Sequence, residues 1–194
     1  MSSEMRNSKP LDLALVALCY FLLACFSAVW DWVSRGSPFQ VWSSSTVPDL
    51  KQLLGSGLFV ALYFLVSRKF LSWSSWGQSL EKLLLQLLTP ISYFQIVSLA
   101  LMSALVEEWF FRGILVAHFG TISSALFFGL CHLIPSARLW SWSLIAFGMG
   151  LVLGALYAAT QSLWLCVWIH ALLNAAGLFY LNLRAYSRPS FRNA

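Results

Sequence analysis

The stretch LVEEWFFRGIL occupies residues 105–115 and places two adjacent carboxylates, Glu107 and Glu108, inside a run of apolar residues. Hydrocarbon offers no water to solvate a charge. An acidic side chain inside a membrane-spanning segment therefore faces the interior of a helical bundle, and its presence indicates a functional role. This one stretch predicts both a membrane fold and the place of its functional site.

The composition of the whole chain favours the same fold. Of the 194 residues, 59% are hydrophobic and 10% are charged, whereas ordinary soluble domains carry about 25% charged residues. This excludes an ordinary soluble domain. The net charge of +5 is better explained by the excess of Lys and Arg in cytoplasmic loops than by a nucleic-acid partner, and we expect none.

The four cysteines lie in apolar segments and show no CxxC spacing. They are Cys19, Cys25, Cys131 and Cys166. We expect them to be small buried apolar residues rather than a disulfide framework or a zinc cluster.

Apolar stretches of spanning or near-spanning length predict about six transmembrane helices. They cover residues 11–33, 52–67, 91–117, 121–134, 139–159 and 162–184. The polar stretches 34–52 and 67–79 are expected to be loops, and residues 80–90 fit either an interfacial helix or part of another crossing. The predicted fold class is all-α: a polytopic helical membrane bundle over residues 1–194, with motif-free helices in 1–90 and the functional helices in 91–184.

The distribution of basic residues predicts the orientation in the membrane. With six crossings, one side carries both termini and Arg6, Lys9, Arg68, Lys69, Lys82, Arg138, Arg184, Arg188 and Arg192, and the other carries Arg35 and Lys51. Because cytoplasmic loops are enriched in Lys and Arg, we expect both termini in the cytoplasm.

Rare polar residues of three predicted helices lie at a similar depth. They are Glu107, Glu108, Arg112, His132, His170 and Asn174. At 1.5 Å per residue, Glu107 lies roughly 20 Å from the turn at Gly120, and His132 lies roughly 18 Å from that turn on the antiparallel helix. We therefore expect these side chains to converge, nearer the cytoplasmic leaflet than the bilayer centre. His118, beside the turn, is expected to be interfacial.

Spacing within each helix predicts which side chains share a face. Glu108 and Arg112 are four residues apart, the spacing of a helical ion pair. Glu107 is rotated from Glu108 by about 100° and is therefore free to point elsewhere. The same four-residue spacing relates Phe128 to His132, His170 to Asn174, and Gly150 to Gly154. The glycine pair is typical of close packing between membrane helices.

Three motifs, in order and on separate apolar helices, resemble the CPBP family of intramembrane proteases, also called the CAAX-protease or Abi family. This family includes the Ras-converting prenyl-protein endopeptidases. EEWFFR (107–112) fits EExxxR, FGLCH (128–132) fits FxxxH, and HALLN (170–174) fits HxxxN. The resemblance covers roughly residues 91–180, and residues 1–90 carry no matching motif.

The resemblance implies a glutamate-type intramembrane endopeptidase that needs no cofactor. By position, Glu107 and His132 activate water and His170 and Asn174 stabilise the oxyanion, while Glu108 pairs with Arg112 and Phe128 shapes the pocket. The implied partners are the lipid bilayer and a membrane-associated protein or peptide, with a sorting-signal or CAAX-like C-terminal segment or a bacteriocin as possible substrates. The implied location is a bacterial inner (plasma) membrane.

Two alternatives remain open from the sequence. In the first, Glu107, His132 and His170 bind zinc in a metal-dependent version of the same protease, because one carboxylate and two imidazoles are a known catalytic zinc set. In the second, the polar cluster belongs to a non-catalytic immunity or binding protein of the membrane. Sensitivity to a chelator distinguishes the first, and tolerance of Glu107→Gln distinguishes the second.

Overall fold

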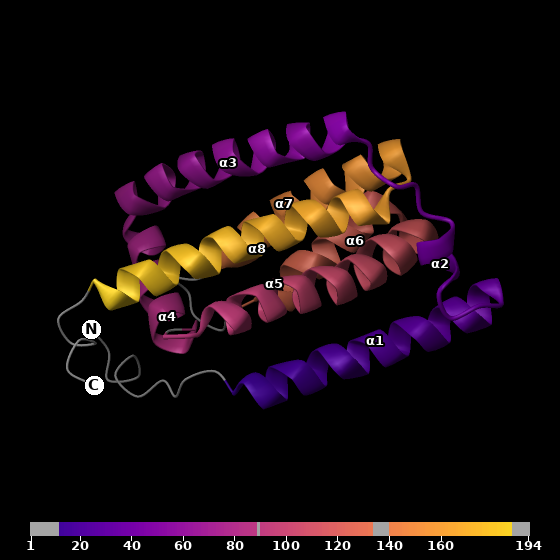
Figure 1. The fold of residues 1–194 in the computed structure, drawn as a ribbon, viewed down its shortest axis with the longest axis horizontal. Coiled ribbons are helices and arrows are strands. Elements are labelled where there is room, and N and C mark those ends of the chain that lie inside the picture. Colours follow the sequence, from indigo (N-terminus) through magenta and orange to yellow (C-terminus); the bar gives the residue numbers. More distant parts are fainter. Residues whose placement is uncertain (1–11, 89, 134–139, 188–194) are drawn as a thin grey trace.

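The described part of the chain is entirely helical. The structure is a computed structural model, which describes residues 12–88, 90–133 and 140–187. Its elements are α1 (Leu13–Arg35), α2 (Gln40–Ser43), α3 (Leu50–Trp73), α4 (Ser75–Leu88), α5 (Tyr93–Glu108), the π-helix η2 (Trp109–Val116), α6 (Ala117–Cys131), α7 (Trp140–Thr160) and α8 (Leu163–Tyr186) (Figure 1). The predicted all-α fold class is confirmed.

Five segments of the described residues are long and apolar enough to cross a membrane. They are Leu13–Arg35, Leu50–Trp73, Tyr93–Cys131, Trp140–Thr160 and Leu163–Tyr186. The third has 39 residues, and at Gly120 its backbone leaves the helical conformation, with φ 79° and ψ 169°. The chain folds back there, since the Ser124 hydroxyl on α6 donates to the Phe111 carbonyl oxygen on η2 over 2.8 Å. The chain is thus an integral multi-pass membrane protein, and the predicted break between two helices at Gly120 is confirmed.

Local sequence signals explain where the main helices begin and end. Asp49 and Gln52 form a capping box at the start of α3, and Ser92 and Gln95 form another at the start of α5. Such reciprocal bonds satisfy amide groups that have no partner inside the helix. At the end of α1, Gly36 adopts φ 80°, the left-handed conformation in which glycine is favoured.

The prediction of a loop over residues 67–79 is wrong. Helix α3 continues to Trp73, and α4 begins at Ser75. Although the stretch is rich in serine, α4 buries Gly77, Leu80 and Leu85, and this packing outweighs the low helix propensity of serine. With 14 residues, α4 is too short to cross a bilayer. Residues 80–88 therefore belong to a short amphipathic helix and not to another crossing.

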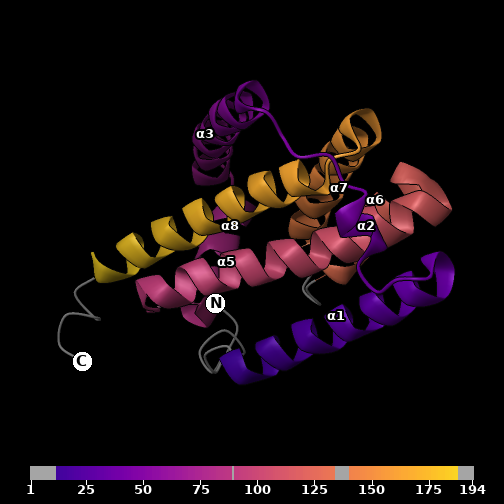
Figure 2. The ribbon, with the colours of Figure 1, turned by 45° about the vertical axis from the view of Figure 1, so that its right-hand side comes forward.

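Helix α8 is the centre of the bundle and α1 lies at its edge. Figures 1 and 2 show α8 between α3 and α5, with α1 along one side. In the most apolar 18-residue stretch of each helix, 39% of the residues of α8 are buried inside the protein, compared with 6% of those of α1. Leu165 and Ile169 of α8 pack with α3 and α7, and Val167 and Ala171 pack with α5. The helix that carries the HxxxN motif is therefore held on several sides.

The prediction that Gly150 and Gly154 allow close packing is confirmed. A Cβ atom on Gly150 would lie 3.0 Å from the Ala125 Cα atom, and one on Gly154 would lie 2.7 Å from Thr121 Cγ2. Because these partners belong to α6, the two glycines let α7 approach the helix that ends at His132.

The prediction of four buried cysteines is wrong for three of them. Cys166 is buried, whereas Cys19, Cys25 and Cys131 are exposed on the protein surface, and all four are free thiols. Apolar side chains in a membrane protein can face lipid as readily as the core, so hydrophobic surroundings in the sequence do not predict burial inside the protein.

Candidate active site

Glu107 and Glu108 occupy the last two positions of α5, directly before the π-helix η2. The exposed fraction is 8% for Glu107 and 0% for Glu108. The π-helix widens the turn that follows the carboxylates. Most π-helical segments are single turns inside α-helices and occur frequently at functional sites; η2, with eight residues, is longer.

Glu108 is the centre of a buried charged cluster. Its Oε1 atom accepts a hydrogen bond from Arg112 Nη1 over 2.9 Å and another from His170 Nδ1 over 2.7 Å. The guanidinium of Arg112 also lies over the Phe128 ring, 4.9 Å from its centroid, which is a favourable cation–π arrangement. The expected Glu108–Arg112 pair is present, and it additionally orients the His170 ring.

Glu107 is held by a residue that the sequence analysis did not select. The Tyr20 hydroxyl, on α1, donates to Glu107 Oε1 over 2.5 Å. The second oxygen, Oε2, is buried without a hydrogen-bond partner and lies 3.8 Å from His170 Nε2. The expectation that Glu107 is free is therefore correct for one oxygen and wrong for the other.

His132 follows the last residue of α6 and packs on Phe128. The two ring centroids are 4.4 Å apart, and His132 Nδ1 lies 2.7 Å from the Phe128 carbonyl oxygen. A carbonyl oxygen only accepts, so Nδ1 carries the proton and Nε2 of the neutral ring has a free lone pair. The Phe128 ring also lies beside His170, with centroids 6.2 Å apart. Phe128 thus bridges His132 and the Glu108 cluster, and no direct bond joins His132 to Glu107 among the described residues.

Asn174 lies one turn after His170 and is half-buried. Its side-chain Nδ2 donates to the Ser103 hydroxyl on α5 over 2.9 Å. An amide nitrogen carries two N–H groups, so this contact fixes the Asn174 side chain while using one of them. Of the predicted residues, the structure brings Glu107, Glu108, Arg112 and His170 into one cluster, links His132 to it through Phe128, and anchors Asn174 through Ser103.

The side chains do not fit the zinc alternative. No group of three or more His, Cys, Asp or Glu side chains within the described ranges is placed to hold a metal ion. A catalytic zinc needs its ligands at roughly 2.0–2.2 Å from one point.

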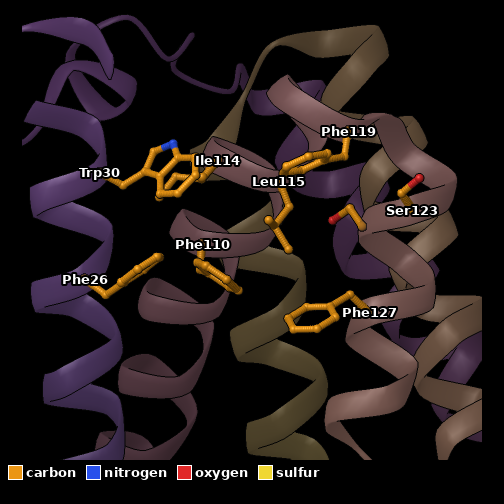
Figure 3. Close-up of a pocket in the computed structure, with 9 residues that line it drawn as sticks. Phe26, Trp30, Phe110, Ile114, Leu115, Phe119, Ser123 and Phe127 are labelled. Atoms are coloured by element: carbon orange, nitrogen blue, oxygen red, sulfur yellow. The ribbon is translucent and has the colours of Figure 1, made fainter. Parts of the chain in front are cut away.

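An apolar cavity of about 400 Å³ lies beside the site, between α1, η2 and α6. In Figure 3, aromatic side chains of α1 and of the opposite helices surround it. The lining residues are Phe26, Trp30, Phe110, Ile114, Leu115, Phe119, Ser123, Ser124 and Phe127. Phe110 contacts Phe111, with centroids 5.0 Å apart, and Phe111 contacts Phe128, with centroids 4.8 Å apart. A continuous aromatic path thus connects the cavity to the polar cluster.

Comparison with protein families identifies the part of the chain that holds this cluster. Residues 89–176 match the family model described as type II CAAX prenyl endopeptidase Rce1-like. The chain carries an Rce1-like domain. This domain belongs to the CPBP family of membrane proteases, so the predicted family and enzyme class are confirmed. Searches of curated proteins and of solved structures return no match.

The Rce1-like domain contains all seven residues that the motifs selected. The sequence analysis missed two further residues that contact the site, Ser103 and Tyr20. Ser103 lies inside the domain, and Tyr20 lies outside it, on α1. The available signal was weak: both are hydroxyl groups within apolar runs, and polar side chains in membrane helices tend to face the bundle interior. Their partners could not be inferred, because the contacts join distant helices.

Proposed function

We propose that the chain is an intramembrane endopeptidase in which Glu107 and His132 activate the attacking water. One observation carries this proposal. In an Rce1-like domain, Glu107 Oε2 is buried without a hydrogen-bond partner, 3.8 Å from the ring of His170. Glu108 Oε2 is also unpaired, although Arg112 and His170 bind that carboxylate through Oε1. For Glu107 Oε2, burial without a partner is costly. It is understandable if that oxygen binds water or substrate during the reaction.

The orientation of His132 supports its role as a second base. Its Nδ1–H group is committed to the Phe128 carbonyl, and Nε2 therefore has the lone pair that can accept a proton from water. A positioned general base contributes typically 10²–10⁴-fold to a rate. Glu107 Oε2 lies near the His170 ring, and His132 packs on Phe128, whose ring also lies near His170. We therefore propose that the water lies close to this group of side chains.

His170 and Asn174 are the proposed donors to the oxyanion. Because Glu108 binds His170 Nδ1, Nε2 donates to the oxyanion only when the ring is doubly protonated. We propose this state, in which His170 and Arg112 balance the charges of the two carboxylates, because a paired buried charge costs less than an unpaired one. Asn174 contributes the N–H group that Ser103 does not use. Donors placed where charge develops are worth about 10²–10³-fold each.

The proposed substrate is a membrane-associated protein or peptide with an apolar segment. The aromatic cavity next to the site supports this, since its lining is almost wholly apolar. A C-terminal CAAX-like or sorting-signal segment and a bacteriocin are the substrate classes that we propose. We also propose that the chain forms one domain, lies in a bacterial inner membrane and has both termini in the cytoplasm.

The decisive experiment compares peptide cleavage in host membranes that contain the wild type or a variant. Glu107→Gln keeps the size of the side chain but removes the base. In Glu107→Gln we expect the rate at which cleavage products form to fall by 10²–10⁴-fold. His132→Ala and His170→Ala should abolish the formation of the same products. The measurement is quantitative mass spectrometry of the membrane peptides, with and without phenanthroline.

Glu81→Gln is the matched control, because Glu81 pairs with the half-exposed Arg184 at 3.1 Å, away from the cluster. It should cleave like the wild type. Full cleavage by Glu107→Gln at normal protein levels would contradict the proposed mechanism. Loss of cleavage with phenanthroline and its return with zinc would instead support the metal-dependent alternative.

A further inference from the structure

We infer that Tyr20 is a positioning residue for Glu107, and that the active site is incomplete without helix α1. The inference rests on the proposed function, because it assigns a role to a neighbour of the proposed base. Residues 89–176 form the Rce1-like domain, and Tyr20 is far outside it. Its hydroxyl nevertheless makes the hydrogen bond that Glu107 receives from another helix.

The hydrogen bond makes the two oxygens of the carboxylate different. Tyr20 donates to Oε1, whereas Oε2 has no partner and faces His170 Nε2 at 3.8 Å. A phenol donates one proton, so Tyr20 binds a single oxygen and fixes the rotation of the carboxylate. It therefore selects Oε2 as the atom that meets water. A hydrogen bond to an ionised group is also among the stronger ones in proteins.

Helix α1 needs its own anchor for this role, because little of its surface is buried. The anchor lies three turns after Tyr20. Asp31 is 0% exposed and binds both Arg35 and the Val41 amide. Arg35 Nη2 in turn donates to the Gly113 carbonyl of the π-helix over 2.7 Å. Helix α1 is thus attached at both sides of the site, to Glu107 just before the π-helix and to Gly113 within it.

Helix α5, which Tyr20 contacts through Glu107, also carries the residue that holds Asn174. Ser103, which fixes Asn174, is one turn before Glu107 on the same helix, α5. Tyr20 therefore binds the helix that carries both the proposed base and the residue that holds a proposed oxyanion donor.

The test compares Tyr20→Phe with Glu107→Gln and with a matched control, Tyr63→Phe. Tyr63 is half-buried on α3, where its ring lies near Phe59. Removal of the Tyr20 hydroxyl alone should lower kcat by about tenfold to hundredfold, the range for a lost hydrogen bond to a charged group. KM should stay within about twofold, because Tyr20 touches the base and not the substrate. Tyr63→Phe should leave both constants unchanged.

The assay uses the full-length protein in membranes and the host peptide whose cleavage depends on Glu107. Loss of activity in Glu107→Gln with wild-type activity in Tyr20→Phe would overturn this inference alone. Full activity in both variants would overturn the proposed function. If Tyr20→Phe raised KM by tenfold to hundredfold and left kcat unchanged, the positioning role would also be overturned.

A second measurement does not depend on activity. Thermal unfolding of the detergent-solubilised wild type, Tyr20→Phe, Glu107→Gln and the double variant forms a double-mutant cycle. If Tyr20 donates to Glu107, the shifts in Tm should be non-additive. Tyr20→Phe removes the donor, and Glu107→Gln replaces the charged acceptor with a neutral amide oxygen that forms a weaker bond. Strictly additive shifts would overturn the contact on which the inference depends.

Discussion

At the scale of single residues, the buried Glu108–Arg112 pair shows how this site tolerates charge inside a membrane. Both side chains are almost completely buried, with exposed fractions of 0% and 1%. Two further partners complete the environment: His170 donates to the carboxylate, and the Phe128 ring lies under the guanidinium. Some donors are still unpaired, including Arg112 Nε and Nη2. Burial of either charge alone would be strongly unfavourable, and the ion pair between Glu108 and Arg112 offsets part of that cost.

The first prediction at this scale concerns Arg112→Met. The substitution leaves Glu108 buried without its cation, and breaking a buried pair in this way costs about 3–5 kcal/mol. The matched control is Arg184→Met, which removes a partner from an ion pair whose arginine is 52% exposed. That change should cost less than about 1 kcal/mol. Thermal unfolding in detergent measures both, and equal losses would contradict the structural role given to Arg112.

At the scale of elements, the π-helix η2 is held by side chains from two other helices. Ser124 of α6 donates to the Phe111 carbonyl, and Arg35 of α1 donates to the Gly113 carbonyl. A π-helix is rare and occurs frequently at functional sites. Here the supports come from the helices on either side of the apolar cavity. The local backbone after Glu107 and Glu108 is thus a consequence of tertiary contacts.

The packing of α6 against α7 positions His132, and it leads to a prediction about Gly150. A side chain there would meet the Ala125 backbone, with its Cβ 3.0 Å from the Ala125 Cα atom. Gly148 on the same helix has nothing within 4 Å of an added Cβ. We expect Gly150→Val to be less stable than Gly148→Val by about 1–3 kcal/mol, the usual cost of overpacking.

Because valine replaces glycine in both variants, differences in helix propensity cancel. The measurement is the midpoint of thermal unfolding of the two purified proteins. Gly150→Val should also reduce cleavage by more than Gly148→Val, since α6 carries His132. Equal midpoints would show that α6 and α7 do not depend on this close contact.

At the scale of the whole molecule, the described basic residues other than the buried Arg112 are divided between the two ends of the bundle. Arg68 and Lys69 near the end of α3, Lys82 in α4 and Arg184 near the end of α8 lie at one end in Figure 1. Arg35 and Lys51 are found at the other, where α1 ends and α3 begins. The other basic residues used to predict the orientation, Arg6, Lys9, Arg138, Arg188 and Arg192, lie outside the described residues.

This division predicts a topology that single cysteines can test. In a background where the four native cysteines are replaced by alanine, we expect Ser72→Cys to be protected from a membrane-impermeant thiol reagent in intact cells. Ser43→Cys, at the opposite end, should be labelled. Both serines are exposed, so access to the reagent depends on the side of the membrane. The reverse labelling would place the α4 end outside the cytoplasm.

The sequence by itself determined the helical membrane fold and most of the candidate site. Hydropathy predicted the long helices, and Gly120 marked the reversal between two of them. The spacing of Glu108 and Arg112 predicted their ion pair, which the structure contains. These features were accessible because each depends on residues close together in the chain, through helical periodicity or an abrupt change in polarity.

Only the tertiary structure decided how the helices complete the site. Tyr20 reaches Glu107 across 87 positions of sequence, and His170 reaches Glu108 across 62. No local pattern predicts such pairs, because each residue alone is compatible with facing lipid, a helix or a cavity. Three cysteines faced outward for the same reason, and the serine-rich residues 67–79 became helical through packing. Contacts between distant helices, which sequence periodicity does not specify, therefore set the environment of each polar group.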